Sequence, residues 1–237
     1  MKRKALLIGY TGEGSEETTI DGVLLDLEKY KNYLMSIRGG AWYANEIKVL
    51  NTPTKAQLKQ EILIASTADL TFTVFSGHGD FDDMEHGCRR FLLNKNEFIL
   101  EKDLWNITKK QILICDSCAG YRSTSANEDI MEEKRISNLL ETSHERFTAR
   151  QKYEDWCKAC DNQLIRLYAA QPDTYAEDQD GGVYTTQLIS ALKEARESIS
   201  ILEAHNIAKP NVESRTNGQK PTHSYPRVKR ILPGAII

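Results

Sequence analysis

A histidine and a cysteine each follow an apolar run in this chain, and small residues flank both of them. His78 lies between Gly77 and Gly79 after the run LTFTVFS, and Cys118 is the third residue after the run QILIC. A thiol attacks a carbonyl carbon as the thiolate, so it needs a base or a cation close by, and an imidazole supplies this. The two residues therefore predict nucleophilic catalysis by a cysteine–histidine pair.

The glycines beside His78 add to this prediction. Gly77 and Gly79 allow the backbone to turn tightly next to a substrate. The backbone N–H groups of Gly79 and Cys118 would together form an oxyanion hole for the charge that develops on the attacked carbonyl. Loss of one such donor typically costs about 10²–10³ in rate.

The cysteines also allow other interpretations. A lone cysteine after a strand is usually a small buried hydrophobic residue. Cys115 and Cys118 have the spacing of a redox pair, and together with Cys157 and Cys160 they have the spacing of a zinc site. Cys115 falls inside an apolar run, however, and Cys157 and Cys160 lie beside Trp156 at near-helical spacing, which favours thiols that pack a helix. We predict no metal site, with zinc as the alternative.

Alternating strands and helices must position the two motifs. Strands are expected at 4–10, 47–50, 70–76, 111–115 and 164–170, helices at 21–38, 54–65 and 182–195, and a hairpin at 90–100. This order predicts an α/β fold with a mainly parallel central sheet and helices on both faces. Sites in such sheets form at the carboxyl ends of strands, and neighbouring strands lie about 5 Å apart. His78 and Cys118 are therefore expected to meet at one end of the sheet.

The remaining segments carry weaker patterns. We expect one domain over residues 1–237, with an inserted regulatory loop and helical segment at about 121–161, because that stretch is charged and becomes helical only in its second half. The tail from 209 to 237 is expected to be rich in loops and to end in a last strand.

Composition limits the classes of function. The chain has 237 residues, 40% of them hydrophobic, and a net charge of −3, which does not indicate a nucleic-acid-binding or membrane-surface protein. The apolar run after the basic start is too short for a signal peptide, and no run approaches the length of a membrane span. Five cysteines, an odd number, favour free thiols in a reducing compartment. These features predict a cytoplasmic protein.

The motifs resemble those of the caspase superfamily, and within it the chain is most similar to metacaspases and bacterial caspase-like proteins. Ser76-Gly77-His78-Gly79 and Asp116-Ser117-Cys118-Ala119-Gly120 each follow an apolar strand. The stretch 22–26 resembles the metacaspase pattern of glycine, three residues and aspartate. Ala176-Glu177 and the stretch 181–185 resemble the family's Ala-Glu and Gly-Gly-Val-Phe-Thr patterns. The resemblance spans nearly the whole chain and implies a caspase-like three-layer sandwich.

The resemblance also implies roles for the matched residues of a cysteine endopeptidase acting on proteins or peptides. His78 would be the base and Cys118 the nucleophile. Asp26 and Asp116 match the acidic residues that line the primary specificity pocket of metacaspases. Two carboxylates favour a bidentate cationic guest, so cleavage is expected after Arg or Lys. The alternatives are a charge on a solvated helix face for Asp26 and a turn residue for Asp116.

Some features depart from the metacaspase pattern. Ala169 and Ala170 stand in the segment where metacaspases carry a serine that shapes the pocket. Many metacaspases need calcium, but the spacing of their aspartates is not reproduced, and Asp82, Asp83 and Glu85 are expected to form a solvated loop. We therefore expect no cofactor, with calcium as the alternative.

The resemblance finally implies regulation. Family members are often activated by a cut after the catalytic strand, and the basic residues Arg122, Lys134, Arg135, Arg146 and Arg150 are candidates for self-cleavage. A separate activator protein and a role in bacterial defence or cell death are further expectations. The rival hypotheses are a catalytically silent caspase-like module that binds a partner, and a relative with a different preferred residue at the cleavage site.

Overall fold

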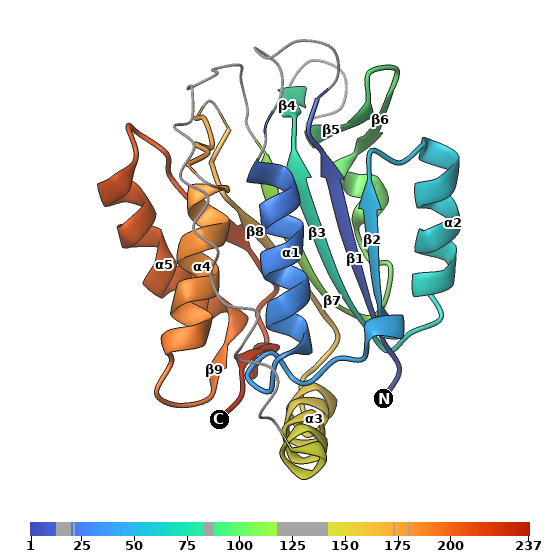
Figure 1. Cartoon of the computed structure of the whole chain (residues 1–237), viewed down its shortest axis with the longest axis vertical. Coiled ribbons are helices and arrows are strands. Elements are labelled where there is room, and N and C mark those ends of the chain that lie inside the picture. Colours follow the sequence, from blue (N-terminus) through green and yellow to red (C-terminus); the bar gives the residue numbers. More distant parts are fainter. Residues whose placement is uncertain (13–19, 21, 83–87, 118–141, 173, 180) are drawn as a thin grey trace.

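A six-stranded sheet forms the centre of the molecule. The structure, a computed structural model, describes residues 1–12, 20, 22–82, 88–117, 142–172, 174–179 and 181–237. The sheet strands are β1 (Arg3–Tyr10), β2 (Ile47–Asn51), β3 (Leu70–Gly77), β7 (Lys110–Ser117), β8 (Gln163–Tyr168) and β10 (Thr222–Ser224). They lie in the order β10-β8-β7-β3-β1-β2 (Figure 1). All neighbours run parallel except β10 and β8, which confirms the predicted sheet.

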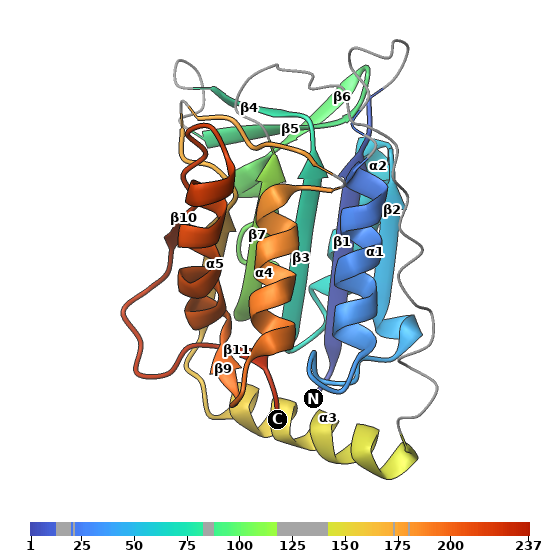
Figure 2. The same ribbon diagram turned by 60° about the vertical axis from the view of Figure 1, so that its left-hand side comes forward.

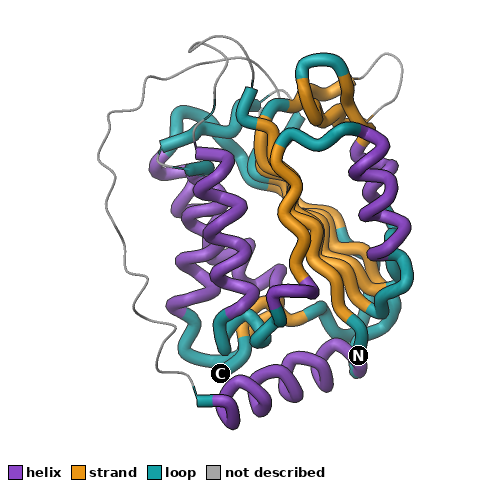
Figure 3. Tube along the Cα trace, turned by 45° about the vertical axis from the view of Figure 1, so that its right-hand side comes forward, coloured by secondary structure: helices purple, strands orange, loops and turns teal. Residues whose placement is uncertain are grey.

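Helices cover both faces of this sheet. They are α1 (Gly22–Met35), α2 (Lys55–Ala65), α3 (Ser143–Lys158), α4 (Val183–Glu194) and α5 (Ile201–Arg215), with 3₁₀ turns η2 (Ala44–Glu46) and η3 (Glu101–Leu104). Figures 1 and 3 show α1, α4 and α5 on one face and α2 on the other. The central strands are buried on both faces, as expected for a parallel sheet between helices. The predicted α/β three-layer fold is confirmed.

Two separate hydrophobic clusters fill the space between the layers. The cluster on the α1 side includes Leu7, Val74 and Tyr184, and the cluster on the α2 side includes Leu6 and Phe75. Consecutive residues of β1 and β3 therefore point to opposite clusters, because side chains alternate along a strand. This double burial fixes the register of β3 against β7.

A small second sheet extends the α2 face near the carboxyl ends of the central strands. It contains β4 (Gly79–Asp82), β5 (Cys88–Asn94) and β6 (Glu97–Leu100) in the order β4-β5-β6. The hairpin of β5 and β6 was predicted, whereas β4 was not. Its sequence, GDFD, carries no apolar alternation, and it forms a strand by pairing antiparallel with β5 directly after His78.

The C-terminal part corrects one prediction. The tail was expected to be rich in loops from residue 209, but α5 continues to Arg215 through Pro210. Proline inside a helix costs about 3 kcal/mol. Ala208 and Val212 are fully buried on either side of Pro210, and their burial offsets that cost. The short strands β9 (Ile199–Ser200) and β11 (Pro233–Ala235) pair with each other, so the chain does end near a strand, as predicted.

Helix α3 lies across the end of the sheet away from the carboxyl ends of the parallel strands (Figure 2). The Lys110 Nζ, at the start of β7, donates to the Cys157 carbonyl at the end of α3 at 2.7 Å. Helix α3 falls in the second half of the segment 121–161, for which an inserted regulatory element stays a prediction, and residues 121–141 lie outside the described residues. Within the described part of the chain, no helix is both long and apolar enough to span a membrane.

Candidate active site

The two predicted motifs lie side by side at the carboxyl ends of β3 and β7. In the parallel register Ser76 is opposite Asp116, and Gly77 is opposite Ser117. Gly77 has φ of +137°, and a Cβ at this position would overlap the Tyr10 carbonyl oxygen. Only glycine accepts both this conformation and this close approach. The chain therefore turns at Gly77 and carries His78 out of the sheet.

His78 is half-buried at this turn. Its ring lies edge-on to the Tyr10 ring, with 5.7 Å between the ring centroids. Its carbonyl accepts the Leu92 N–H at 3.0 Å, which joins the turn to β5. The backbone of His78 is thus held by the small sheet, and an aromatic ring borders its imidazole.

Cys118 lies outside the described residues, and the structure reaches its neighbour Ser117. Ser117 is buried, and a Cβ at Gly79 would lie 3.1 Å from both the Cβ and the Oγ of Ser117. The turn that carries His78 therefore packs directly against the residue before Cys118. A contact between His78 and Cys118, and the oxyanion hole of Gly79 and Cys118, stay predictions.

Asp26 and Asp116, which we call the acidic pair, are both buried beside these strand ends. They are 2% and 4% exposed, so neither is a solvated helix charge or a surface turn residue. Asp26 projects from α1 and accepts the Ser76 hydroxyl at 2.9 Å and the Gly182 N–H at 3.0 and 3.1 Å. Ser76 is the register partner of Asp116, so both carboxylates belong to one site.

Asp116 is held by the first turn of α4. Its Oδ2 accepts the Thr185 hydroxyl at 2.5 Å and the Thr185 N–H at 3.1 Å. A Cβ at Gly182 would overlap Asp116 Oδ2 and would lie 3.0 Å from Asp26 Oδ2. Gly182 therefore stands between the two carboxylates, and the absence of a side chain allows its approach to both.

Burial determines the charge state of the acidic pair. It raises the pKa of Asp116 to about 6, partly opposed by the hydrogen bonds from Thr185. Burial also raises the pKa of Asp26 well above its usual range, and the charge of Asp116 raises it further. Both shifts follow from removing a carboxylate from water near another carboxylate. The Lys29 ammonium, 4.0 Å from Asp26 Oδ1, acts in the opposite direction on both groups.

A third carboxylate lies nearby. Asp178 is half-buried, accepts the Gly181 N–H at 2.9 Å, and raises the pKa of both members of the acidic pair. A Cβ at Gly22 would overlap the Asp178 carboxylate. The site therefore gathers negative charge from α1, β7 and the segment before α4, and close glycines make room for it.

The segment after β8 is fixed to the body of the protein by two buried side chains. Gln219 donates to the Ala169 carbonyl at 3.0 Å and accepts the Glu177 N–H at 3.0 Å, which bridges both ends of the segment. Arg89 donates to the Ala170 carbonyl. Ala169 and Ala170 are themselves fully buried. They contribute backbone to this segment and no polar wall to the site.

The described thiols do not form a metal site. Cys115 belongs to the hydrophobic cluster on the α2 side of the sheet, whereas Cys157 and Cys160 belong to the cluster on the α1 side. Cys115 therefore does not share a site with Cys157 and Cys160, because these thiols lie on opposite faces of the sheet. Cys160 Sγ contacts the Trp156 carbonyl at 3.3 Å, as expected for helix packing.

No group of three or more potential metal ligands occurs among the residues that the structure describes. The acidic stretch considered for calcium falls largely outside them. Asp83, Glu85 and the side chain of Asp82 lie outside the described part of the chain.

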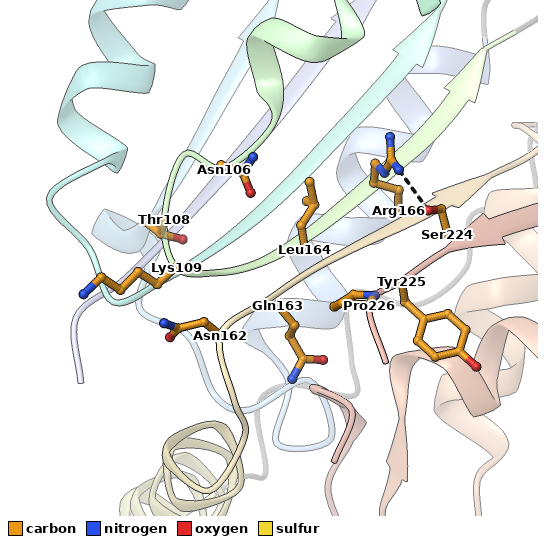
Figure 4. A pocket seen from close by; sticks show the side chains of 10 residues that line it. All are labelled: Asn106, Thr108, Lys109, Asn162, Gln163, Leu164, Arg166, Ser224, Tyr225 and Pro226. Carbon is orange, nitrogen blue, oxygen red and sulfur yellow. Dashed lines mark hydrogen bonds between the residues drawn. The ribbon is translucent and has the colours of Figure 1, made fainter. Parts of the chain in front are cut away.

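A cavity in the described part of the chain lies away from the candidate site. It measures about 600 Å³ and opens beside the amino ends of β7 and β8, where Lys109, Asn162 and Gln163 line it (Figure 4). The acidic pair lies at the opposite ends of the strands. The cavity is therefore separate from the candidate site.

Several residues of the site are not evident from single positions in the sequence. Ser76 and Thr185 are ordinary hydroxyl residues whose partners are distant along the chain. Gly182 and Thr185 do fall in the Gly-Gly-Val-Tyr-Thr stretch, which was the available signal. Lys29 and Asp178 carry no motif, and only the packing of α1 against the start of α4 reveals them.

The comparisons with known proteins agree with this fold. The sequence matches the family model described as Caspase domain over residues 2–232. The fold is similar to that of caspase-1 from Spodoptera frugiperda, with a TM-score of 0.62 and 12% identity over 94% of this chain and 86% of that chain. It is also similar to a protein of Geobacter sulfurreducens, with a TM-score of 0.57 and 16% identity over 95% of this chain and 93% of that one. No curated protein matches the sequence.

Proposed function

The chain belongs to the caspase-domain family of cysteine peptidases, and from this premise we propose that it is an endopeptidase that cleaves proteins after arginine or lysine. The observation that carries the proposal is the burial of the acidic pair beside the strand ends that lead into His78 and Cys118. A buried pair of carboxylates is stable as anions only with cationic or hydrogen-bonding partners. A basic substrate side chain supplies such a partner.

In the proposed reaction, His78 removes the proton of the Cys118 thiol. The thiolate then adds to the carbonyl carbon of the peptide bond, and the N–H groups of Gly79 and Cys118 stabilise the resulting oxyanion. His78 returns the proton to the leaving amine, and a thioester remains on Cys118. Water activated by His78 then releases the acid product and restores the thiol.

The acidic pair would determine which peptide bond reaches Cys118. Asp116 is two residues before Cys118, and Asp26 is tied to Ser76, two residues before His78. A guanidinium can bond to two carboxylate oxygens at once, and an ammonium binds as a point charge. The preferred residue on the amino side of the cut would then be basic, as in metacaspases, and not acidic.

Self-cleavage remains part of the proposal, with a smaller set of sites. Arg146 and Arg150 lie within α3, where Arg146 bonds to the Met35 carbonyl and Arg150 to Glu46. A peptidase binds its substrate as an extended strand, so a cut at these residues would require α3 to unwind. We therefore propose Arg122, Lys134 or Arg135 as the self-cleavage site, with a separate activator protein as the other route of control.

The experiment is a panel of fluorogenic peptides that end in Arg, Lys, Asp, Asn or Leu, tested with and without calcium. The wild-type chain is compared with Cys118→Ala, which lacks the nucleophile, and Asp116→Asn, which lacks one pocket charge. Hydrolysis after Arg or Lys that vanishes in Cys118→Ala and falls at least tenfold in Asp116→Asn would support the proposal.

Other outcomes separate the rival hypotheses. Hydrolysis after Asp, Asn or Leu would keep the nucleophile and overturn the pocket assignment. No hydrolysis of any peptide, with or without calcium, together with no alkylation of Cys118 by an iodoacetamide probe, would indicate a silent binding module.

A further inference from the structure

Lys29 is a resident cation beside the acidic pair. It lies on α1, one turn after Asp26, and its Nζ is 4.0 Å from Asp26 Oδ1. The same Nζ donates to the Thr186 hydroxyl on α4 at 2.9 Å. Thr186 directly follows Thr185, which holds Asp116, so the ammonium lies between α1, which supplies Asp26, and α4, which fixes Asp116.

The ammonium is also packed against the glycines of this site. A Cβ at Gly181 would overlap the Lys29 Nζ and would lie 2.8 Å from Asp26 Oδ1. Gly181 has φ of +106°, a conformation that favours glycine. The close approach of this backbone therefore sets the position of the ammonium relative to the acidic pair.

The charge of Lys29 reaches both carboxylates. It lowers the pKa of Asp26 and the pKa of Asp116, which burial raises. The Lys29 side chain is 29% exposed, whereas that of Asp26 is 2% exposed. The lysine is therefore the more exposed member of this ion pair.

We propose that Lys29 is a specificity-determining residue that makes the acidic pair prefer arginine over lysine at the cleavage site. This inference rests on the proposed function of the acidic pair. With the acidic pair and Asp178 ionised, three carboxylates and the Lys29 ammonium leave a net charge of −2, which still favours a cationic guest. A lysine guest would bring a second compact ammonium next to the first, and the two repel each other. An arginine guest spreads its charge over a planar group and bonds to two carboxylate oxygens.

The test compares kcat/KM for matched peptides that end in Arg or Lys. For the wild type we expect a preference for arginine of about tenfold, since the site is partly screened by solvent. In Lys29→Met the lysine peptide should gain more than the arginine peptide, so that the ratio falls to about two. Lys29→Arg, which keeps a cation at this place, should retain a preference of several-fold.

Lys31→Met is the matched control, because Lys31 is an exposed lysine on the same helix. Its arginine-to-lysine ratio should equal that of the wild type, and the melting temperatures of all variants verify folding. A ratio that is unchanged in Lys29→Met, with arginine and lysine peptides still cleaved, would overturn the inference and leave the proposed function intact. Cleavage by the wild type after a residue other than Arg or Lys would overturn both.

If the chain is inactive without its activator, a binding measurement tests the role of Lys29 instead. The probes are N-acetyl-arginine methylamide and N-acetyl-lysine methylamide, titrated by calorimetry into Cys118→Ala and into Cys118→Ala with Lys29→Met. The inference would be supported if Cys118→Ala binds the arginine probe more tightly than the lysine probe and if this difference disappears when Lys29 is also replaced. Equal binding of the two probes, or no binding of either, would overturn it.

Discussion

The backbone N–H of Gly182 donates to both carboxylate oxygens of Asp26, at 3.0 and 3.1 Å, although 156 positions separate the two residues in the sequence. This contact joins α1 to the start of α4 across the carboxyl ends of the central strands. It also means that a carboxylate of the acidic pair is oriented by backbone, which is more rigid than a side-chain donor. The geometry of the pair therefore depends on the conformation of one glycine.

Gly182→Ala should damage the site by steric overlap alone. Gly182 has φ of −53°, which any residue can adopt, but an added Cβ would overlap Asp116 Oδ2 and crowd Asp26 Oδ2. We expect a loss of about 1–3 kcal/mol in the free energy of unfolding and a large drop in kcat/KM for basic peptides. Chemical denaturation and peptide hydrolysis measure the two effects.

Gly218→Ala is a contrasting control for that substitution. Gly218 has φ of +95°, and apart from its chain neighbours no heavy atom of the described residues lies within 4 Å of an added Cβ. Only the backbone conformation opposes alanine there, so we expect a loss of about 1 kcal/mol and unchanged hydrolysis. Equal effects of the two substitutions on hydrolysis would contradict the role of Gly182 in orienting the acidic pair.

The acidic pair predicts a pH dependence of cation binding. Burial raises the pKa of Asp116 to about 6, so its carboxylate becomes protonated as the pH falls through this value. The dissociation constant of N-acetyl-arginine methylamide for Cys118→Ala should then rise up to about tenfold per pH unit below pH 6. Calorimetry between about pH 5 and pH 8 measures it, and a flat profile would exclude an ionised Asp116 from the binding site.

The raised pKa of Asp116 also makes the free energy of unfolding depend on pH. The folded-state pKa of Asp116 lies above its ordinary value of 3.8, so the folded chain binds this proton more tightly than the unfolded chain. The stabilising contribution of Asp116 is therefore complete below pH 3.8 and is lost as the pH rises to about 6. Asp116→Asn should remove this part of the pH dependence of the unfolding free energy.

His205 predicts a loss of stability toward acidic pH. It is fully buried on α5, its Nδ1 lies 2.7 Å from the Tyr184 hydroxyl, and burial lowers its pKa to about 3. The unfolded chain takes up this proton near its ordinary pKa of 6.5, so stability should fall as the pH drops below that value, by up to about 1.4 kcal/mol per pH unit. Denaturant titrations at a series of pH values should show a shallower dependence in His205→Gln. His144→Gln, at an exposed position of α3, should behave as the wild type does.

The thiols should differ in reactivity. Burial raises the pKa of Cys157 to about 12 and that of Cys115 well above its usual range, so both are unreactive thiols at neutral pH. In the folded chain iodoacetamide should therefore modify Cys118 first. Peptide mapping by mass spectrometry should find the label on Cys118 in the wild type. In Cys118→Ala no other cysteine should become labelled in its place. Preferential labelling of Cys115 or Cys157 would contradict the described packing.

The central elements were predictable because their patterns are local. The apolar runs of β1, β3 and β7, and the capping Thr54 of α2, appear directly in consecutive residues. Strand β4 and helix α5 were not predicted in this way. The first is a polar segment ordered by its neighbour β5, and the second contains Pro210 and is maintained by burial of Ala208 and Val212.

The candidate site was likewise predictable only where its residues follow local patterns. The adjacency of the His78 and Cys118 motifs follows from parallel strands that end together, and the register of Ser76 with Asp116 agrees with it. The partners of the acidic pair come from α4, far along the chain, and depend on how α1 and α4 pack on the sheet. Tertiary contacts of this kind leave no pattern of spacing in one sequence. The position of Lys29 beside the acidic pair could therefore be found only from the packing of the helices.

The pairing of β7 with β8 has a consequence for any cut between them. Residues Lys110–Cys115 are in register with Gln163–Tyr168, and all of 118–141 lies in the connection between these two strands. The cluster on the α1 side of the sheet takes side chains from both sides of that connection, such as Val74 and Tyr184. Two polypeptides produced by a break there would each lack half of the core. They would persist as an obligate heterodimer, and genes encoding the two halves separately should yield a reconstituted protein.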